Sequence, residues 1–99
     1  MAEYSGNRSG SRECINQPVS FELSGIESGR LRNIQKSGLG VDISAGGMGL
    51  TTDYQLHTGN VLKLYFPVAA GHAHLPVFTE VIWSRPAGGG FKAGLRFLA

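Results

Sequence analysis

Apolar and polar residues alternate one by one along much of this chain, and this alternation limits its fold more than any other feature. Successive side chains of a β-strand point to opposite faces, so a period of two indicates strands with one buried face. The predicted strands span residues 18–23, 30–35, 39–44, 61–66, 75–84 and 91–97. No window of helical length repeats its apolar residues at intervals of three and four. The sequence therefore predicts an all-β fold with little or no helix.

The segment 39–44 shows how the alternation assigns faces. Leu39, Val41 and Ile43 share one face, which we expect to pack in the core. Asp42 and Ser44 then share the opposite face, so we expect a carboxylate and a hydroxyl side by side on the outer surface.

Glycine-rich turns join the predicted strands. The chain has 15 glycines in 99 residues, about twice the usual share of ~7%. They cluster in turn-like segments at residues 24–29, 45–47 and 88–90. A chain of this length forms one domain with one small core, and a barrel is favoured over a sandwich because closure leaves no free sheet edge.

The N-terminal residues differ from the rest in composition. Residues 1–13 carry few apolar side chains and several Gly and Ser, so we expect a flexible arm, followed by the barrel domain over residues 14–99. The arm contains Arg8 and Arg12, four residues apart. A guanidinium group can bind phosphate oxygens in pairs, read a guanine edge or stack on a base.

Composition bounds the class of protein. A formal net charge of +2 does not by itself imply a nucleic-acid or membrane partner. The single Cys14 cannot form an internal disulfide, and no segment has the length and hydropathy of a membrane span or a secretory signal. We therefore expect a cytoplasmic protein without membrane insertion.

A second polar cluster lies at the end of the segment 39–44. Asp42 can accept hydrogen bonds from a guanine edge, Ser44 can bond a phosphate or base oxygen, and Gly47 lets a ligand approach the backbone. Taken alone, such residues are more often an ordinary strand-ending turn, as the two arginines are more often a solvated arm. Together, cationic donors and an anionic acceptor are what a ligand with guanine and phosphate groups requires.

At this point the sequence resembles the PilZ domain family of cyclic di-GMP receptors. The RxxxR motif of that family is met by Arg8 and Arg12, and its [DN]xSxxG motif by Asp42, Ser44 and Gly47. Further similarities are the Pro-Val pair at 18–19, the apolar-plus-Trp segment at 81–83 and the closing strand at 94–97. The resemblance spans residues 8–97.

The resemblance implies a six-stranded antiparallel β-barrel that binds cyclic di-GMP on its outer surface, beneath the arm. It implies that Arg8 and Arg12 bind phosphate and guanine, that Asp42 and Ser44 bond a guanine base, and that Gly47 permits close approach. It also implies a protein partner or flanking domain that receives the signal, in processes such as motility or biofilm formation. Asn7 stands where many members carry another Arg, which leaves open one ligand or an intercalated pair.

Two alternative functions remain open. The first alternative is a protein-interaction adaptor of the same fold that binds no nucleotide, and the second is a barrel that binds single-stranded nucleic acid. An enzyme is disfavoured because no pair of base and nucleophile is evident, and we expect no catalytic residue and no cofactor. His57, His72 and His74 lack the spacing of a metal site, so no metal is expected either. Trp83 is expected to pack in the core or at the barrel rim, with contact to a base as the less common role.

Overall fold

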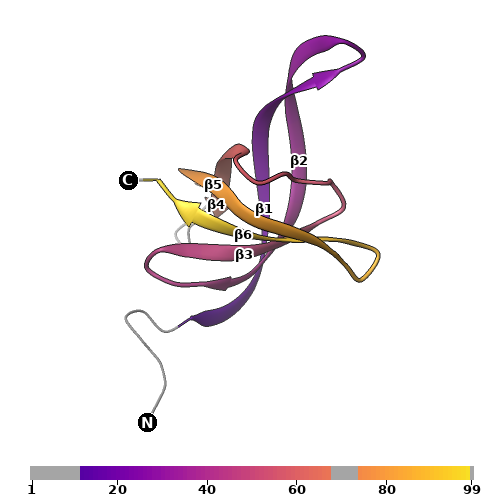
Figure 1. Cartoon of the computed structure of the whole chain (residues 1–99). Helices are drawn as coiled ribbons and strands as arrows, with labels where there is room; N and C mark the ends of the chain where they lie inside the picture. Colours follow the sequence, from indigo (N-terminus) through magenta and orange to yellow (C-terminus); the bar gives the residue numbers. More distant parts are fainter. Residues whose placement is uncertain (1–11, 68–73, 99) are drawn as a thin grey trace.

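Six antiparallel strands close into a barrel in the computed structural model, which describes residues 12–67 and 74–98 (Figure 1). The strands are β1 (Glu13–Glu27), β2 (Arg30–Ile43), β3 (Gly47–Thr52), β4 (Val61–Pro67), β5 (His74–Ala87) and β6 (Gly90–Phe97). Their order around the barrel is β1-β2-β3-β6-β5-β4, and pairing of β1 with β4 closes it. This confirms the predicted fold class. The described residues include no helix with the length and hydropathy needed to cross a membrane.

The core consists of the inward side chains of all six strands and of Leu56 in the segment between β3 and β4. The predicted inward face of β1 is confirmed, since Val19, Phe21 and Leu23 are all buried. The other members of the core are Ile34, Met48, Leu50, Leu56, Leu62, Leu64, Val81, Ala93 and Leu95. Burial of these side chains is the main force that stabilises the barrel.

A bulge in β2 changes which residues face the core. The predicted strands 30–35 and 39–44 are one continuous strand, and its pairing with β3 shifts register between Gly40 and Asp42, so that Val41 is an extra residue. Before the bulge Gly40 faces inward, where an added Cβ would lie 2.6 Å from Met48 Cε. Leu39 therefore points away from the core, and its predicted inward position is wrong. After the bulge the predicted phase returns, with Ile43 packed against the core and Asp42 outside.

A second bulge has the same effect in β5. Its pairing with β6 shifts register between Val81 and Trp83, which leaves Ile82 as the extra residue. Val81 is fully buried, whereas Trp83 lies on the outer face with 39% of its surface exposed. Of the two packing positions expected for Trp83, the core is therefore wrong, while its ring packs on the barrel surface over Gly94.

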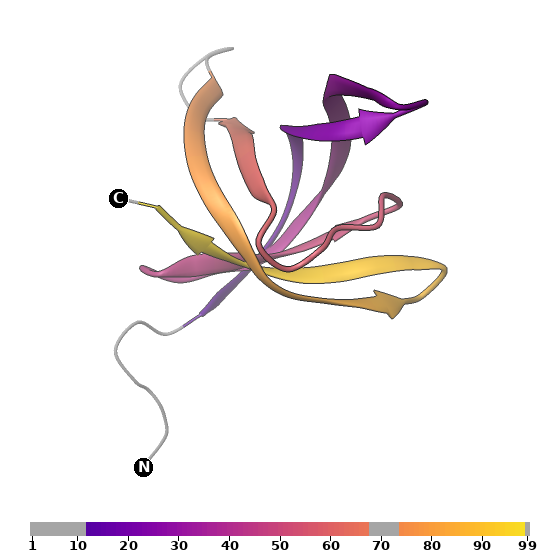
Figure 2. The ribbon, with the colours of Figure 1, turned by 45° about the horizontal axis from the view of Figure 1, so that its top comes forward.

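The hairpin of β1 and β2 extends well beyond the barrel (Figures 1 and 2). Pairing of β1 with β4 covers only Ser20–Glu22, so the outer part of the hairpin is a two-stranded ribbon that ends in a turn at Ser28 and Gly29. Both turn residues have positive φ, 52° and 76°, which the non-glycine Ser28 adopts at some cost. The base of the ribbon is fixed to β4 by the Tyr65 hydroxyl, which donates to Glu22 Oε2 at 2.7 Å.

This contact predicts a pH-dependent contribution to stability. The hydrogen bond from Tyr65, and then that from Asn33 at 3.2 Å, lower the pKa of Glu22 below its ordinary value of 4.5. A carboxyl group whose pKa is lowered in the folded state stabilises the fold at pH values above its unfolded-state pKa. This stabilisation is lost as the pH falls through the folded-state pKa. In Tyr65→Phe we expect a higher pKa for Glu22 and a smaller loss of thermal stability between about pH 7 and about pH 3. Carboxyl NMR titration checks the pKa, and an unchanged Glu22 titration would contradict the assignment.

Candidate functional site

The RxxxR and DxSxxG segments meet through Arg12, which directly precedes β1. Because β1 pairs with β2 from Glu13 opposite Ile43, Arg12 lies beside the last residues of β2. Its Nη2 and Nε donate to Asp42 Oδ1 at 2.8 and 3.2 Å, and its Nη1 lies 3.5 Å from Ser44 Oγ. The structure thus brings together Arg12, Asp42 and Ser44. Arg8, the other arginine of the motif, lies outside the described residues.

One carboxylate oxygen of Asp42 accepts hydrogen bonds within the protein, and the other is open to a ligand. Oδ1 accepts from Arg12 and also from the backbone N–H of Gly49 at 2.9 Å. An added Cβ on Gly49 would lie 2.9 Å from the same oxygen, so a side chain at this position would displace the Asp42 carboxylate. Within the described part of the chain no donor reaches Asp42 Oδ2. A half-buried carboxylate with one open oxygen is a strong acceptor for N–H groups of a ligand.

The DxSxxG segment turns the chain from β2 into β3. The N–H of Ser44 donates to the carbonyl of Gly47 at 2.9 Å, and the Phe97 N–H donates to the carbonyl of Gly46 at 2.9 Å. Gly47 is buried against β6, where an added Cβ would lie 2.0 Å from the Leu95 carbonyl oxygen. The glycine of the motif is therefore required by the packing of the barrel itself, a role that the sequence did not indicate.

One row of residues crosses four strands of the outer face and joins Asp42 to Trp83. The register pairs Asp42 with Gly49, Gly49 with Gly94, and Gly94 with Trp83. The Trp83 ring lies over Gly94, where an added Cβ would be 2.2 Å from its Nε1. The row therefore has an acid at one end, an aromatic ring at the other and two glycines without side chains between them, which suits a flat polar ring such as a nucleobase.

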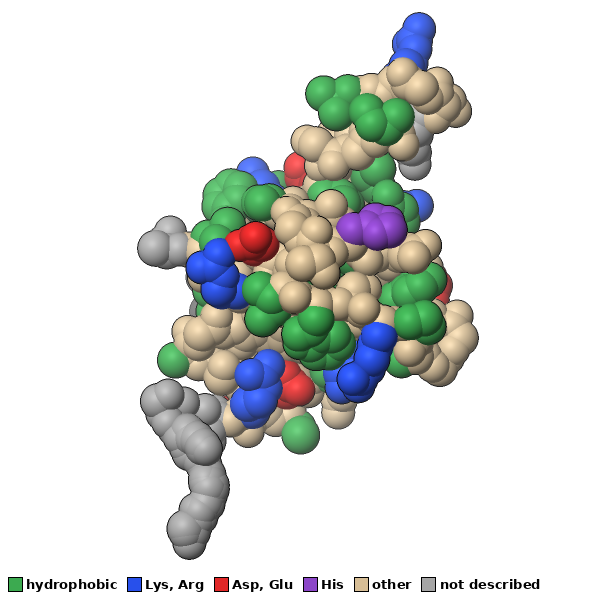
Figure 3. Space-filling view, in the orientation of Figure 1, with side chains coloured by type: hydrophobic (Ala, Val, Ile, Leu, Met, Phe, Trp, Pro, Cys, Tyr) green, Lys and Arg blue, Asp and Glu red, His purple; other side chains and the backbone are tan. Residues whose placement is uncertain are grey.

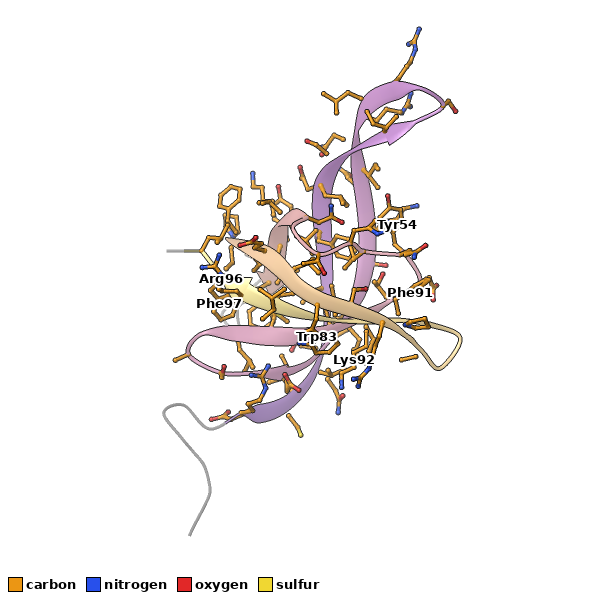
Figure 4. All side chains as sticks on the ribbon, viewed as in Figure 1. Tyr54, Trp83, Phe91, Lys92, Arg96 and Phe97 are labelled. Atoms are coloured by element: carbon orange, nitrogen blue, oxygen red, sulfur yellow. The ribbon has the colours of Figure 1, made fainter. Side chains whose placement is uncertain are left out.

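This row lies in a surface hollow of about 450 Å³. Cations surround it: Arg85 packs over Trp83 with its guanidinium carbon 5.1 Å from the ring centre, and Lys92 and Arg96 line the wall (Figure 4). Figure 3 shows cationic side chains around an apolar area on this face. Arg96 forms an ion pair with Glu80. The excess of cationic groups favours an anionic ligand.

The sequence missed several of these residues as members of the site. Cross-strand register brings Gly49 and Gly94 into the site, and the curvature of the barrel brings in the cations Arg85, Lys92 and Arg96. The sequence shows neither the register nor the curvature. For Trp83 the sequence indicated contact with a base only as the less common role, because the outward position of this residue depends on the bulge at Ile82.

The remaining candidates are Cys14 and the histidines. Cys14 is exposed and pairs with Asp42 in the register of β1 and β2. In the described residues no three His, Cys, Asp or Glu side chains could hold one metal ion. Of the histidines weighed as a metal pair, His72 lies outside the described residues.

Comparisons with known proteins agree with this architecture. A family model described as PilZ domain matches residues 7–99. The chain is similar in fold to the PilZ domain with c-di-GMP of YcgR from Escherichia coli, with a TM-score of 0.66 and 16% identity over 94% of this chain and 79% of that one. It is also similar to the Bacillus subtilis inhibitor of motility (MotI/DgrA), with a TM-score of 0.59 and 19% identity over 94% of this chain but only 43% of that one. No curated protein matches the chain.

Proposed function

The chain belongs to the PilZ domain family, and we propose that it is a receptor that binds cyclic di-GMP in the hollow between Asp42 and Trp83. The observation that carries the proposal is the cross-strand row of Asp42, Gly49, Gly94 and Trp83. It offers an acceptor for a guanine edge, a glycine at position 49 that has no side chain of its own, and an aromatic ring that covers Gly94. The structure of the YcgR domain with c-di-GMP, similar in fold, adds support.

The guanine base is recognised by its hydrogen-bond donors. Its N1 and N2 hydrogens point to the open Oδ2 of Asp42, because Arg12 and Gly49 already occupy Oδ1. The base lies over Gly49, beside the Trp83 ring that covers Gly94. Ser44 Oγ, which lies 3.5 Å from Arg12 Nη1, would bond the same ligand.

The phosphates are bound by cations from both sides of the hollow. Arg12 keeps two N–H groups on Asp42 and can direct the remaining ones at a phosphate oxygen. Arg85 and Lys92 lie at the opposite wall. Arg8 would reach the ligand from the N-terminal arm, residues 1–13, and Gly47 keeps the backbone of β3 close to the barrel. In this proposal the ligand acts as a signal.

In this proposal the N-terminal arm transmits the signal. Cyclic di-GMP favours the state in which the arm lies over the hollow, and the extent of the change is set by the difference in ligand affinity between the open and closed states. The covered surface differs from the uncovered one in shape and charge. A cytoplasmic protein partner or a flanking domain would read that difference.

Calorimetric titration with cyclic di-GMP tests the proposal. We expect binding to the wild-type protein and binding at least about tenfold weaker to Arg12→Ala, because a charge-assisted contact and the anchor of Asp42 are both lost. Arg30→Ala removes an exposed arginine of the distant hairpin and should leave the affinity unchanged. The same titration gives the number of ligands bound per chain.

The alternatives predict different results. A wild-type protein that gives no heat and no NMR shift with the nucleotide would contradict the proposal and favour the adaptor that binds only proteins. Tight binding of an oligonucleotide with a steep salt dependence would favour the nucleic-acid barrel.

A further inference from the structure

The β1–β2 hairpin leaves one side of β2 without a neighbouring strand. β2 pairs with β1 along its whole length, but it pairs with β3 only from Gly38 onward. Over residues 30–36, which we call the β2 edge, no other described residue pairs with the second side of the strand. All residues of the β2 edge except Ile34 are exposed. Its outward N–H and C=O groups therefore face solvent.

We propose that the β2 edge is a docking site for an extended acidic segment of a partner protein, which adds beside β2 as a further strand. The site is separate from the nucleotide hollow, and the proposal does not depend on nucleotide binding. An open strand edge binds an extended segment through main-chain hydrogen bonds, and the flanking side chains choose its sequence.

The charges of the β2 edge select an acidic segment. The chain from Ser28 to Val41 contains Arg30, Arg32 and Lys36 and no acidic residue. Alternation places these three cations on one face of the ribbon. Arg30 is exposed, and the Lys36 ammonium lies 5.3 Å from the centre of the Tyr54 ring, at the base of the ribbon. Two copies of this edge would align like charges across the pair, which disfavours a second copy of the chain as the occupant.

The opposite face of the ribbon adds an apolar contact. Ile26 and Leu31 lie directly across from each other near the tip, and they expose 69% and 75% of their surfaces, the highest values among the large apolar residues described. Figure 3 shows apolar side chains and a cationic one at the end of this hairpin. A strand on the β2 edge would place every second side chain beside Leu31 and the others beside the cations. The fitting partner segment therefore alternates acidic and apolar residues.

The experiment uses the full chain and a capped synthetic peptide, as long as the β2 edge, in which glutamate and valine alternate. We expect NMR shifts and slower amide hydrogen exchange at residues 30–36 when the peptide is added. Arg30→Glu should weaken the binding by at least about fivefold, the size of one exposed ion pair. Arg85→Glu, which reverses the same charge on the β5–β6 hairpin, should not change it.

Two control peptides separate strand addition from simple charge attraction. A peptide N-methylated at alternate residues keeps the charges but loses main-chain donors, and a peptide of alternating lysine and valine keeps the pattern but reverses the charge. Both should fail to bind. The proposal is overturned if the glutamate peptide leaves residues 30–36 unaffected, or if the N-methylated peptide binds equally well. It is also overturned if only vesicles of anionic lipid perturb the hairpin, a result that would point to a membrane surface instead.

Discussion

Asp42→Ala is expected to weaken cyclic di-GMP binding by roughly 100-fold. The variant removes the open oxygen that accepts from the guanine edge, and a hydrogen bond to a charged group contributes about 1.5–3 kcal/mol. It also removes the acceptor that holds the Arg12 guanidinium at 2.8 Å, so that Arg12 loses its position beside the ligand. Because each factor of ten in affinity corresponds to about 1.4 kcal/mol, the two losses together account for the expected change. Calorimetric titration measures it.

Asp53→Ala is the matched control for this variant. Asp53 is an exposed aspartate that lines a different hollow, between β2, β3 and the β5–β6 hairpin. Its removal should leave the affinity unchanged. If the folded Asp42→Ala and wild-type proteins bind cyclic di-GMP equally well, Asp42 does not contact the guanine edge. Circular dichroism checks that both proteins are folded.

Gly47→Ala is expected to destabilise the barrel by about 3 kcal/mol, which is near the upper end for an overpacked site. The added Cβ would lie 2.0 Å from the Leu95 carbonyl oxygen, which is part of the β6 backbone and cannot turn away as a side chain could. β3 and β6 must then separate at the point where they pair. For a chain of about this size the cost corresponds to a fall in Tm of about 15 °C, measured by thermal unfolding.

The neighbouring Gly46→Ala offers a close comparison. An added Cβ at Gly46 meets no atom within 4 Å, and its φ is not positive, so we expect a change in stability of less than about 0.5 kcal/mol. Equal unfolding temperatures for the two variants would show that the barrel accommodates a side chain at Gly47 and that the glycine serves only the ligand.

The alternation of apolar residues predicted the fold class and much of the core. It succeeded for Val19, Phe21 and Leu23 because β1 is regular where it crosses the barrel. It failed for Leu39 because a bulge moves the phase by one residue, and a bulge is set by the fit of neighbouring strands around a closed barrel. No local pattern in the sequence marks Val41 or Ile82 as the extra residue.

Part of the candidate site could likewise be predicted from the sequence, and part of it could not. Asp42, Ser44 and Arg12 could be predicted to lie together because the resemblance to the PilZ motifs implies it. Gly49, Gly94 and Trp83 could not, since their meeting depends on the register of four strands that are distant in sequence. The roles of Arg8 and of the arm stay predictions, as does the division of the chain at residue 13.

The chain carries one cysteine and one tryptophan, and the fold places both beside the same row of residues. Cys14 is exposed and lies opposite Asp42, while Trp83 stands at the far end of that row. A thiol-reactive dye on the natural cysteine would therefore accept excitation energy from the natural indole across the width of the hollow. Entry of a ligand between these two groups would change the energy transfer, so occupation of the hollow could be followed optically in real time, without any substitution in the protein.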